Sequence, residues 1–191
     1  MKVHLGCGRN IMPGWVNVDR SPLPGVDLVT ELDDPNKIML PWPDDSVDEY
    51  AIIHTLEHIR YPLPLMEELW RAAKPGATMT IACPYGSSDD ADEDPTHVRR
   101  MFAGSWGYFG QPHFWRADYG YRGDWQPVRV ELFMFPGLEG CTDGELQSMI
   151  RFQRNVVAEM AATLRCVKPA REPRADLQET YTVTPTRQSS A

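Results

Sequence analysis

The first 84 residues alternate short apolar segments with turns, and this alternation restricts the possible folds more than any other feature. Strand-like patterns cover residues 2–5, 14–19, 25–32, 50–53 and 78–84. Apolar residues at helical spacing lie between the last two, and the segment KPGA at 74–77 ends that pattern. Strands that alternate with turns and a helix predict an α/β fold with a doubly wound, mostly parallel sheet. An α+β domain with other strand pairings is the alternative.

The second half of the chain has a different character. Residues 86–125 begin acidic and become rich in aromatic residues and glycine, which is unusual for a linker and indicates an insertion after the fifth strand. Residues 128–135 alternate like a late strand. Thr142 and Glu145 match a capping box, and apolar spacing up to Leu164 predicts a C-terminal helix. We expect one domain over residues 1–168 and a flexible tail over 169–191.

Size and composition fit one soluble domain. The chain has 191 residues and a formal net charge of −8, which argues against a large basic face for nucleic acid. No run approaches the ~20 apolar residues of a membrane helix, and we expect no secretion signal. The four cysteines are scattered without a C-x-x-C pair. We therefore expect a cytoplasmic protein with no membrane contact.

Three polar features follow the first three strand patterns. Gly6 and Gly8 form a turn directly after the first, where glycine lets the backbone come close to a ligand. Asp19 ends the second, where a carboxylate can accept both hydroxyls of a ribose. Glu31 ends the third, and its carboxylate can accept an adenine amino group. Together they indicate a site for an adenosine-containing cofactor.

The segments HLGCGRNIMPGWVNVD, VDLVTELDD, LPWPDDSVDEYAIIHTLEHI and RAAKPGATMTIACPY resemble, in order, the motifs of class I S-adenosylmethionine-dependent methyltransferases of the small type 11 group. The resemblance covers residues 2–85. It implies a Rossmann-like core and S-adenosyl-L-methionine as cofactor. It also implies that the cofactor contacts are His4, Gly6, Cys7, Gly8, Asp19, Arg20, Glu31, Leu32 and His54.

Within that resemblance, the glycine turn would wrap the methionine part of the cofactor, Asp19 would hold the ribose, and Glu31 and Leu32 would flank the adenine. The sequence departs from the family pattern in two places. Arg9 and Asn10 stand where a third glycine is usual, and the short spacing to Asp19 leaves room for only about one helical turn. A nicotinamide dinucleotide site and a purely structural turn are the alternatives, and the missing G-x-G-x-x-G pattern counts against the former.

Residues 54–58 read HTLEH and match H-x-x-E-H, a zinc-peptidase pattern. That site needs both histidines on one face of a regular helix. Here the string follows a strand pattern and precedes Pro62 and Pro64, and no third ligand is evident on a downstream helix. We therefore expect a coincidence of spacing and no metal ion.

Two histidines are candidate catalytic residues, because a neutral imidazole can take the proton of an acceptor hydroxyl or amine. His54, at the expected end of the fourth strand, is the first choice and His97 is the second. His58 is expected to be structural. Arg99 or Arg100 could hold an acidic group of the acceptor, although ion pairing on the surface is the commoner role of such arginines.

The predicted function is methyl transfer to an oxygen or nitrogen of a small-molecule acceptor. The insertion 86–125 is the expected lid and acceptor site, although most of its aromatic residues should form a core or a homodimer contact. One alternative is a non-catalytic cofactor-binding or interaction subunit with the same fold. Another, less favoured, is a nucleic-acid methyltransferase, since neither D/N-P-P-Y/F nor Pro-Cys follows the fourth strand.

Overall fold

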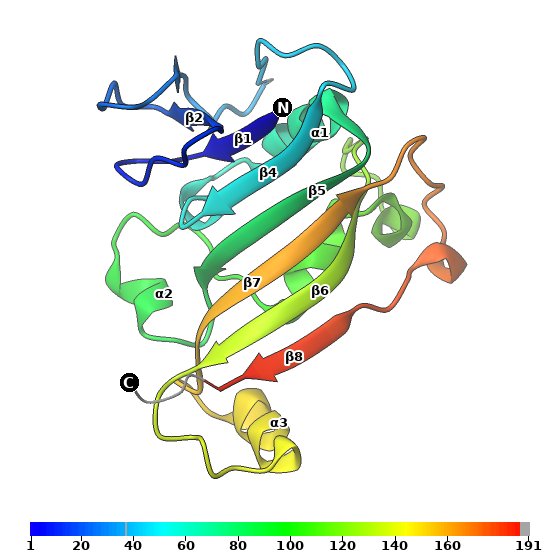
Figure 1. Cartoon of the computed structure of the whole chain (residues 1–191). Helices are drawn as coiled ribbons and strands as arrows, with labels where there is room; N and C mark the ends of the chain where they lie inside the picture. Colours follow the sequence, from blue (N-terminus) through cyan, green and yellow to red (C-terminus); the bar gives the residue numbers. More distant parts are fainter. Residues whose placement is uncertain (37, 188–191) are drawn as a thin grey trace.

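The computed structural model describes residues 1–36 and 38–187, and its centre is a twisted sheet (Figure 1). Within the described residues the sheet has eight strands in the order β3-β2-β1-β4-β5-β7-β6-β8. Their bounds are Lys2–Leu5 (β1), Val16–Asp19 (β2), Leu28–Val29 (β3), Val47–Ile53 (β4), Ala73–Pro84 (β5), Trp125–Met134 (β6), Val157–Cys166 (β7) and Thr182–Thr186 (β8). The first five strands in this order, β3-β2-β1-β4-β5, pair in parallel. Strand β7 is antiparallel to both β5 and β6, and β8 is parallel to β6. The prediction of an α/β fold with a mostly parallel sheet is confirmed.

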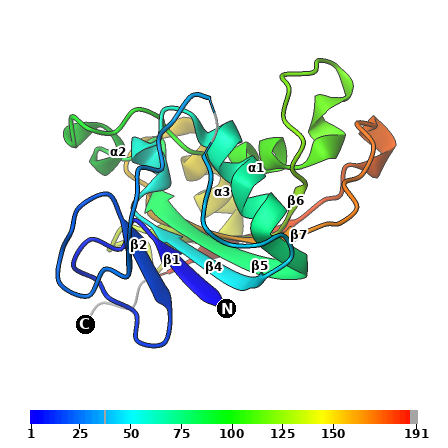
Figure 2. The ribbon, with the colours of Figure 1, turned by 90° about the horizontal axis from the view of Figure 1, so that it is seen from above.

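The helices gather on one face of this sheet. Figure 2 shows the three α-helices on the same side; they are α1 (Pro62–Ala72), α2 (Asp90–Glu93) and α3 (Asp143–Phe152). The connections from β1 to β2 and from β2 to β3 contain turns and no helix. The expected doubly wound arrangement, with helices on both faces of the sheet, is therefore not what the structure has. The other face keeps exposed polar side chains such as Thr78 and Thr80. No helix among the described residues is both long and apolar enough to cross a membrane.

Helix α1 forms where the sequence predicts it. Pro62 and Pro64 lie in its first turn, where proline costs no hydrogen bond. Leu65, Met66 and Leu69 are fully buried against the sheet. This helix carries the chain from the end of β4 back to the start of β5, so it fixes their parallel pairing.

The predicted C-terminal helix is wrong beyond residue 152. Its start is confirmed, because Thr142 Oγ1 accepts a hydrogen bond from the Glu145 amide at 3.3 Å, while Glu145 Oε2 accepts one from the Thr142 amide at 2.8 Å. After α3, residues 157–166 form β7 between β5 and β6. Alternate side chains of β7 are buried, from Met160 to Cys166. Alanines at three of its positions conceal this period of two in the sequence.

The aromatic part of the insertion builds the core rather than a lid. Its 3-10 helix η2 (Ala103–Phe109) packs beside β6, and η3 (Gln111–Trp115) packs against η2. Tyr121 donates a hydrogen bond to the Phe109 carbonyl at 2.9 Å, and Trp125 Nε1 donates one to the Met66 carbonyl at 2.9 Å. The fully or nearly fully buried aromatic residues of this segment are Trp106, Phe109, Phe114, Tyr121 and Trp125. These five aromatic residues are part of the core, which is the role expected for most of the aromatic residues of the insertion.

The segment after residue 168 returns to the sheet. It forms the short η4 (Ala175–Leu177) and then β8, which pairs with β6. Asp124, whose side chain is fully buried, accepts hydrogen bonds from the Arg171 guanidinium through both carboxylate oxygens at 2.9 Å. Residues 182–186 of the expected flexible tail thus form a strand. The last four residues of the chain, 188–191, lie outside the described residues.

We predict that Arg171→Ala lowers the free energy of unfolding by about 3–5 kcal/mol, because it leaves the Asp124 carboxylate buried without its partner. Arg174→Ala is the matched control in the same segment, since Arg174 pairs with Asp176 in an exposed position and should cost no more than about 1 kcal/mol. Urea unfolding of both variants measures the difference. Equal costs would contradict a structural role for the Asp124–Arg171 pair.

Candidate functional site

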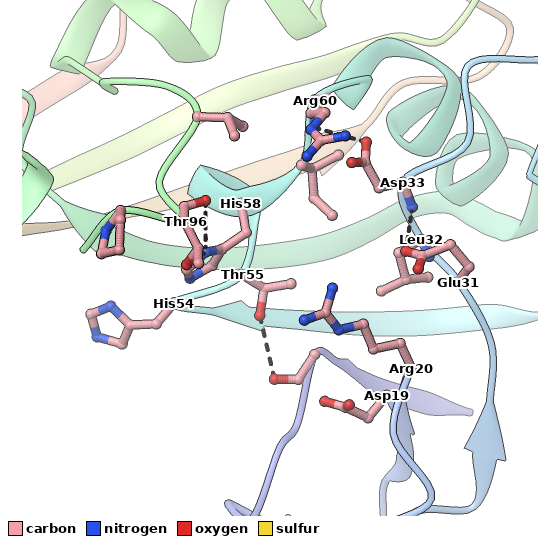
Figure 3. A pocket seen from close by; sticks show the side chains of 14 residues that line it. Asp19, Arg20, Glu31, Leu32, Asp33, His54, Thr55, His58, Arg60 and Thr96 are labelled. Atoms are coloured by element: carbon pink, nitrogen blue, oxygen red, sulfur yellow. Dashed lines mark hydrogen bonds between the residues drawn. The ribbon is translucent and has the colours of Figure 1, made fainter.

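A cavity of about 610 Å³ lies at the carboxyl ends of the central parallel strands (Figure 3). Between β1 and β4 the chain order reverses, because β2 and β3 lie on one side and β5 on the other. Ligands of open α/β sheets bind at such a switch point. The lining residues are Gly6, Asp19, Arg20, Glu31, Leu32, Asp33, His54, Thr55, His58, Ile59, Arg60, Pro95, Thr96 and Val98. Of the nine predicted cofactor contacts, six line it, whereas His4, Cys7 and Gly8 do not.

The glycine turn packs directly against the segment that follows β4. Gly6 has φ +64°, and a Cβ added to it would lie 2.1 Å from Thr55 Oγ1. The Thr55 hydroxyl donates to the Ile53 carbonyl at 3.0 Å and lies 3.3 Å from the Gly6 carbonyl oxygen. Gly6 is therefore required both for its left-handed backbone and for this close approach.

The Asp19 carboxylate is fixed by two backbone amides. Its Oδ2 accepts a hydrogen bond from the Gly8 amide and its Oδ1 accepts one from the Ser21 amide, both at 2.8 Å. Each carboxylate oxygen has a further lone pair. Asp19 thus stands at one end of the cavity with acceptor capacity left for two hydroxyl groups (Figure 3).

The Glu31 carboxylate is used locally in this structure. Its Oε1 accepts hydrogen bonds from the Leu32 amide at 2.8 Å and from the Asp33 amide at 3.0 Å. The Leu32 amide is therefore not free, and the predicted pairing with an adenine needs the Glu31 side chain to rotate away. Asp33 Oδ1 in turn accepts from the amides of Arg60 and Tyr61, at 2.8 and 3.0 Å, which ties this loop to the start of α1.

The HTLEH string does not form a regular helix, as expected. His54 has φ +47°, and only residues 56–58 form a single 3-10 turn, η1. His54 Nε2 lies 3.1 Å from Glu159 Oε2, and its Nδ1 lies 3.5 Å from Glu57 Oε1. The hydrogen bond that His54 donates to the Glu159 carboxylate, and then the nearby Glu57 carboxylate, raises the pKa of His54 to about 10. A protonated imidazole has no lone pair for a proton, so this geometry weighs against the predicted role of His54 as a base.

Side chains from two separate parts of the sequence meet beside the cavity. The rings of His58 and His97 have their centroids 4.7 Å apart. Glu57, His58 and His97 each offer a potential ligand atom, and these atoms lie within 4.8 Å of one another. His58 lines the cavity, whereas the predicted second base, His97, is not among the lining residues. Sequence reasoning missed this cluster, because only the fold brings residue 97 next to residues 57 and 58.

Other predicted residues have structural surroundings. His4 is 2 % exposed, and burial lowers its pKa. Arg99 donates hydrogen bonds to the carbonyls of Ile59 and Arg60, at 3.0 and 2.8 Å. Arg100 pairs with the Asp92 carboxylate through two hydrogen bonds of 2.8 and 2.7 Å. Neither arginine lines the cavity, and of the insertion 86–125 only residues 95, 96 and 98 do.

Comparisons with known proteins agree with this arrangement. Residues 3–81 match the family model Methyltransf_11, described as a methyltransferase domain. The chain contains a class I S-adenosylmethionine-dependent methyltransferase domain. The match spans the strands and turns from β1 into β5 that surround the cavity, and membership of this family implies S-adenosylmethionine as the cofactor. None of the curated proteins matches the chain.

Solved structures share the fold of this methyltransferase domain at low sequence identity. A SAM-dependent methyltransferase from Archaeoglobus fulgidus has a TM-score of 0.57 at 16% identity, over 86% of this chain and 85% of its own. The YcgJ protein from Bacillus subtilis has a TM-score of 0.54 at 13% identity, over 88% and 92%. The [4+2]-cyclase SpnF has a TM-score of 0.52 at 14% identity, over 87% and 75%. At such identities the likeness shows the fold alone, and the acceptor must be argued from the site.

We predict that Gly6→Ala destabilises the methyltransferase domain far more than Gly8→Ala. Both glycines have positive φ, which costs another residue about 1–2 kcal/mol. Only Gly6 meets a side chain, since nothing lies within 4 Å of a Cβ at Gly8, and overpacking adds about 1–3 kcal/mol. Thermal and urea unfolding of the two variants gives the comparison. If Gly6→Ala cost no more than Gly8→Ala, the contact with Thr55 would not constrain the turn.

Proposed function

We propose that this methyltransferase binds S-adenosyl-L-methionine with its adenosine at the Asp19–Glu31 end of the cavity and methylates an oxygen or nitrogen of a small-molecule acceptor at the His54–His58 end. The observation that carries the proposal is the distribution of side chains along the cavity. Asp19, Arg20 and Glu31 line one part of it, and His54, His58 and Thr96 line another (Figure 3). Its volume lies within the ~300–1,000 Å³ typical of small-molecule sites.

The protein's contribution to the reaction is then mainly alignment. The cofactor supplies the activated methyl group, and the glycine turn, Asp19 and Glu31 orient it toward the opposite end of the cavity. An acceptor held there in line with the methyl group gains from proximity and from the exclusion of water. Methyl transfer to oxygen or nitrogen releases a proton, for which solvent or His58, which also lines the cavity, is a better acceptor than the protonated His54.

A nucleic acid acceptor is less well supported. Arginines that would form a basic groove are engaged with acidic side chains, namely Arg100 with Asp92, Arg122 with Asp118 and Arg129 with Glu131. The chain also has a net charge of −8, which disfavours binding through phosphates. Labelled-methyl incorporation into RNA or DNA, but not into small molecules, would reverse this preference.

A second candidate function follows from the uncovered sheet face. Thr78, Thr80 and Arg165 lie exposed on strands in the middle of the sheet, where doubly wound folds carry helices. A partner or a second copy of the chain on this face would fit the alternative of a cofactor-binding subunit that does not transfer methyl groups by itself. Cofactor binding together with a complete lack of methyl transfer to any acceptor pool would favour this alternative.

We predict that the purified protein binds one S-adenosylhomocysteine per chain in a calorimetric titration and that Asp19→Ala weakens binding by about 30-fold or more. The variant loses two hydrogen bonds from ribose hydroxyls to a charged acceptor, each worth about 1–1.5 kcal/mol. Asp34→Ala is the control, because Asp34 lies outside the cavity lining and, among the described residues, accepts a hydrogen bond from the Asn36 amide alone.

Circular dichroism verifies that both variants stay folded, since Asp19 also holds the Gly8 amide. A wild-type protein that binds no S-adenosylhomocysteine would contradict the proposed function. Equal losses in Asp19→Ala and Asp34→Ala would instead contradict the orientation of the cofactor.

A further inference from the structure

The Glu57 carboxylate is buried without a hydrogen bond. Its side chain is 2% exposed, and neither of its oxygens has a hydrogen-bond partner among the described residues. His54 Nδ1 lies 3.5 Å from Oε1, an ion-pair distance that is outside hydrogen-bond geometry. A buried carboxylate that accepts no hydrogen bond is costly even beside a positive group. A native fold retains such a group where an ion or a ligand completes it.

Two imidazoles face the same place as this carboxylate. One potential ligand atom each from Glu57, His58 and His97 lie within 4.8 Å of one another. Ligand atoms of a tetrahedral ion with bonds of about 2.1 Å lie about 3.4 Å apart. Both histidines are partly exposed, so modest rotations of their side chains close this gap.

Hydrogen bonds already orient the two rings as metal ligands are oriented. Thr96 Oγ1 donates to Asp94 Oδ1 at 2.6 Å, so at 2.9 Å from His58 Nδ1 it acts as an acceptor. The Thr96 carbonyl lies 3.3 Å from the same nitrogen. His58 therefore carries its proton on Nδ1, and Nε2 keeps the lone pair that binds a metal.

His97 is oriented in the same way. Its Nδ1 lies 3.2 Å from the Ala91 carbonyl, which can only accept, so the proton is on Nδ1 and the lone pair is on Nε2. Asp94 Oδ2 lies 3.9 Å from that Nε2 and adds a second carboxylate at the edge of the cluster. Together with Glu159 near His54, the surroundings are negative enough for a cation.

We infer that Glu57, His58 and His97 bind a divalent transition-metal ion beside the methyl-transfer cavity. Two imidazoles and one carboxylate suit zinc, cobalt, manganese or iron rather than calcium or magnesium. Three protein ligands leave at least one coordination position for water or a substrate atom, as in catalytic sites. His58 and Thr96 also line the cavity, so the proposed ion lies beside the acceptor end.

This placement deepens the proposed function, on which its catalytic part rests, by naming the acceptor class as a compound with a hydroxyl group. The ion favours loss of the hydroxyl proton to solvent. The oxygen then forms a bond to the methyl carbon, the carbon–sulfur bond breaks, and the sulfur keeps its electron pair as S-adenosylhomocysteine leaves. The HTLEH string thus contributes two metal ligands, Glu57 and His58, although not in the zinc-peptidase arrangement that the sequence analysis rejected.

The test uses the full chain without a histidine tag, stripped of metal by a chelator, with Co²⁺ as a visible-spectrum probe. The wild type should bind one Co²⁺ per chain. Glu57→Gln, which keeps the shape and removes the charge, and His97→Ala should weaken binding by at least about 100-fold, because even loss of a supporting contact costs 10–100-fold. His113→Ala is the control, since His113 lies in η3 outside the cluster.

S-adenosylhomocysteine binding is measured on the same samples. Glu57 and His97 do not line the cavity, so both variants should keep it, and this arm reports on the proposed function independently of the metal. Catechol serves as an oxygen-donor probe and should change the spectrum of bound Co²⁺. Failure of the wild type to bind Co²⁺, or binding by Glu57→Gln and His97→Ala as tight as that of the wild type, overturns the metal site. A spectrum that catechol leaves unchanged overturns the hydroxyl-acceptor class.

Discussion

Parallel pairing of β1 with β2 and β4 is the constraint on which the site depends. In this register Leu5 lies beside Val18 on one side and beside Ile52 on the other. The residues that follow, Gly6 in the turn, Asp19 and His54, therefore emerge at the same edge of the sheet. Side chains that are 13 and 48 positions apart from Gly6 are brought together without any helix between β1 and β2.

Close packing then converts this shared edge into a defined cavity. The Thr55 side chain occupies the space that a Cβ on Gly6 would need. The glycine turn can therefore pack against the segment after β4 only if residue 6 is glycine. Asp33 fastens the loop after β3 to the entrance of α1. The Asp19–Glu31 half of the cavity is thus held by hydrogen bonds from backbone amides to carboxylates. The half toward His58 is built from side chains of η1 and residues 95–98.

Much of this arrangement could be predicted from local sequence. The strand patterns, α1 and the motifs up to residue 85 carry their own signals, because each forms from contiguous residues with clear periodicity or turn residues. Strand β7 could not be recognised, since its alanines resemble a continuation of α3 and its identity depends on pairing with β5 and β6. The aromatic residues after 102 divide between the core and the surface, and sequence alone could not tell which are buried or that only residues 95, 96 and 98 of the insertion reach the cavity.

The candidate site shows the same division. Gly6, Asp19 and Glu31 could be predicted from their positions at strand ends. The protonation of His54, in contrast, depends on Glu159, which lies in β7, the strand that the sequence predicts as helix. The meeting of His97 with Glu57 and His58 likewise has no local signal.

A crystal structure of the protein with S-adenosylhomocysteine tests the central claim most directly. We predict ribose hydroxyls on the Asp19 carboxylate and the sulfur directed toward His58; a ligand outside this cavity, or one with its adenosine at the His58 end, would contradict the account.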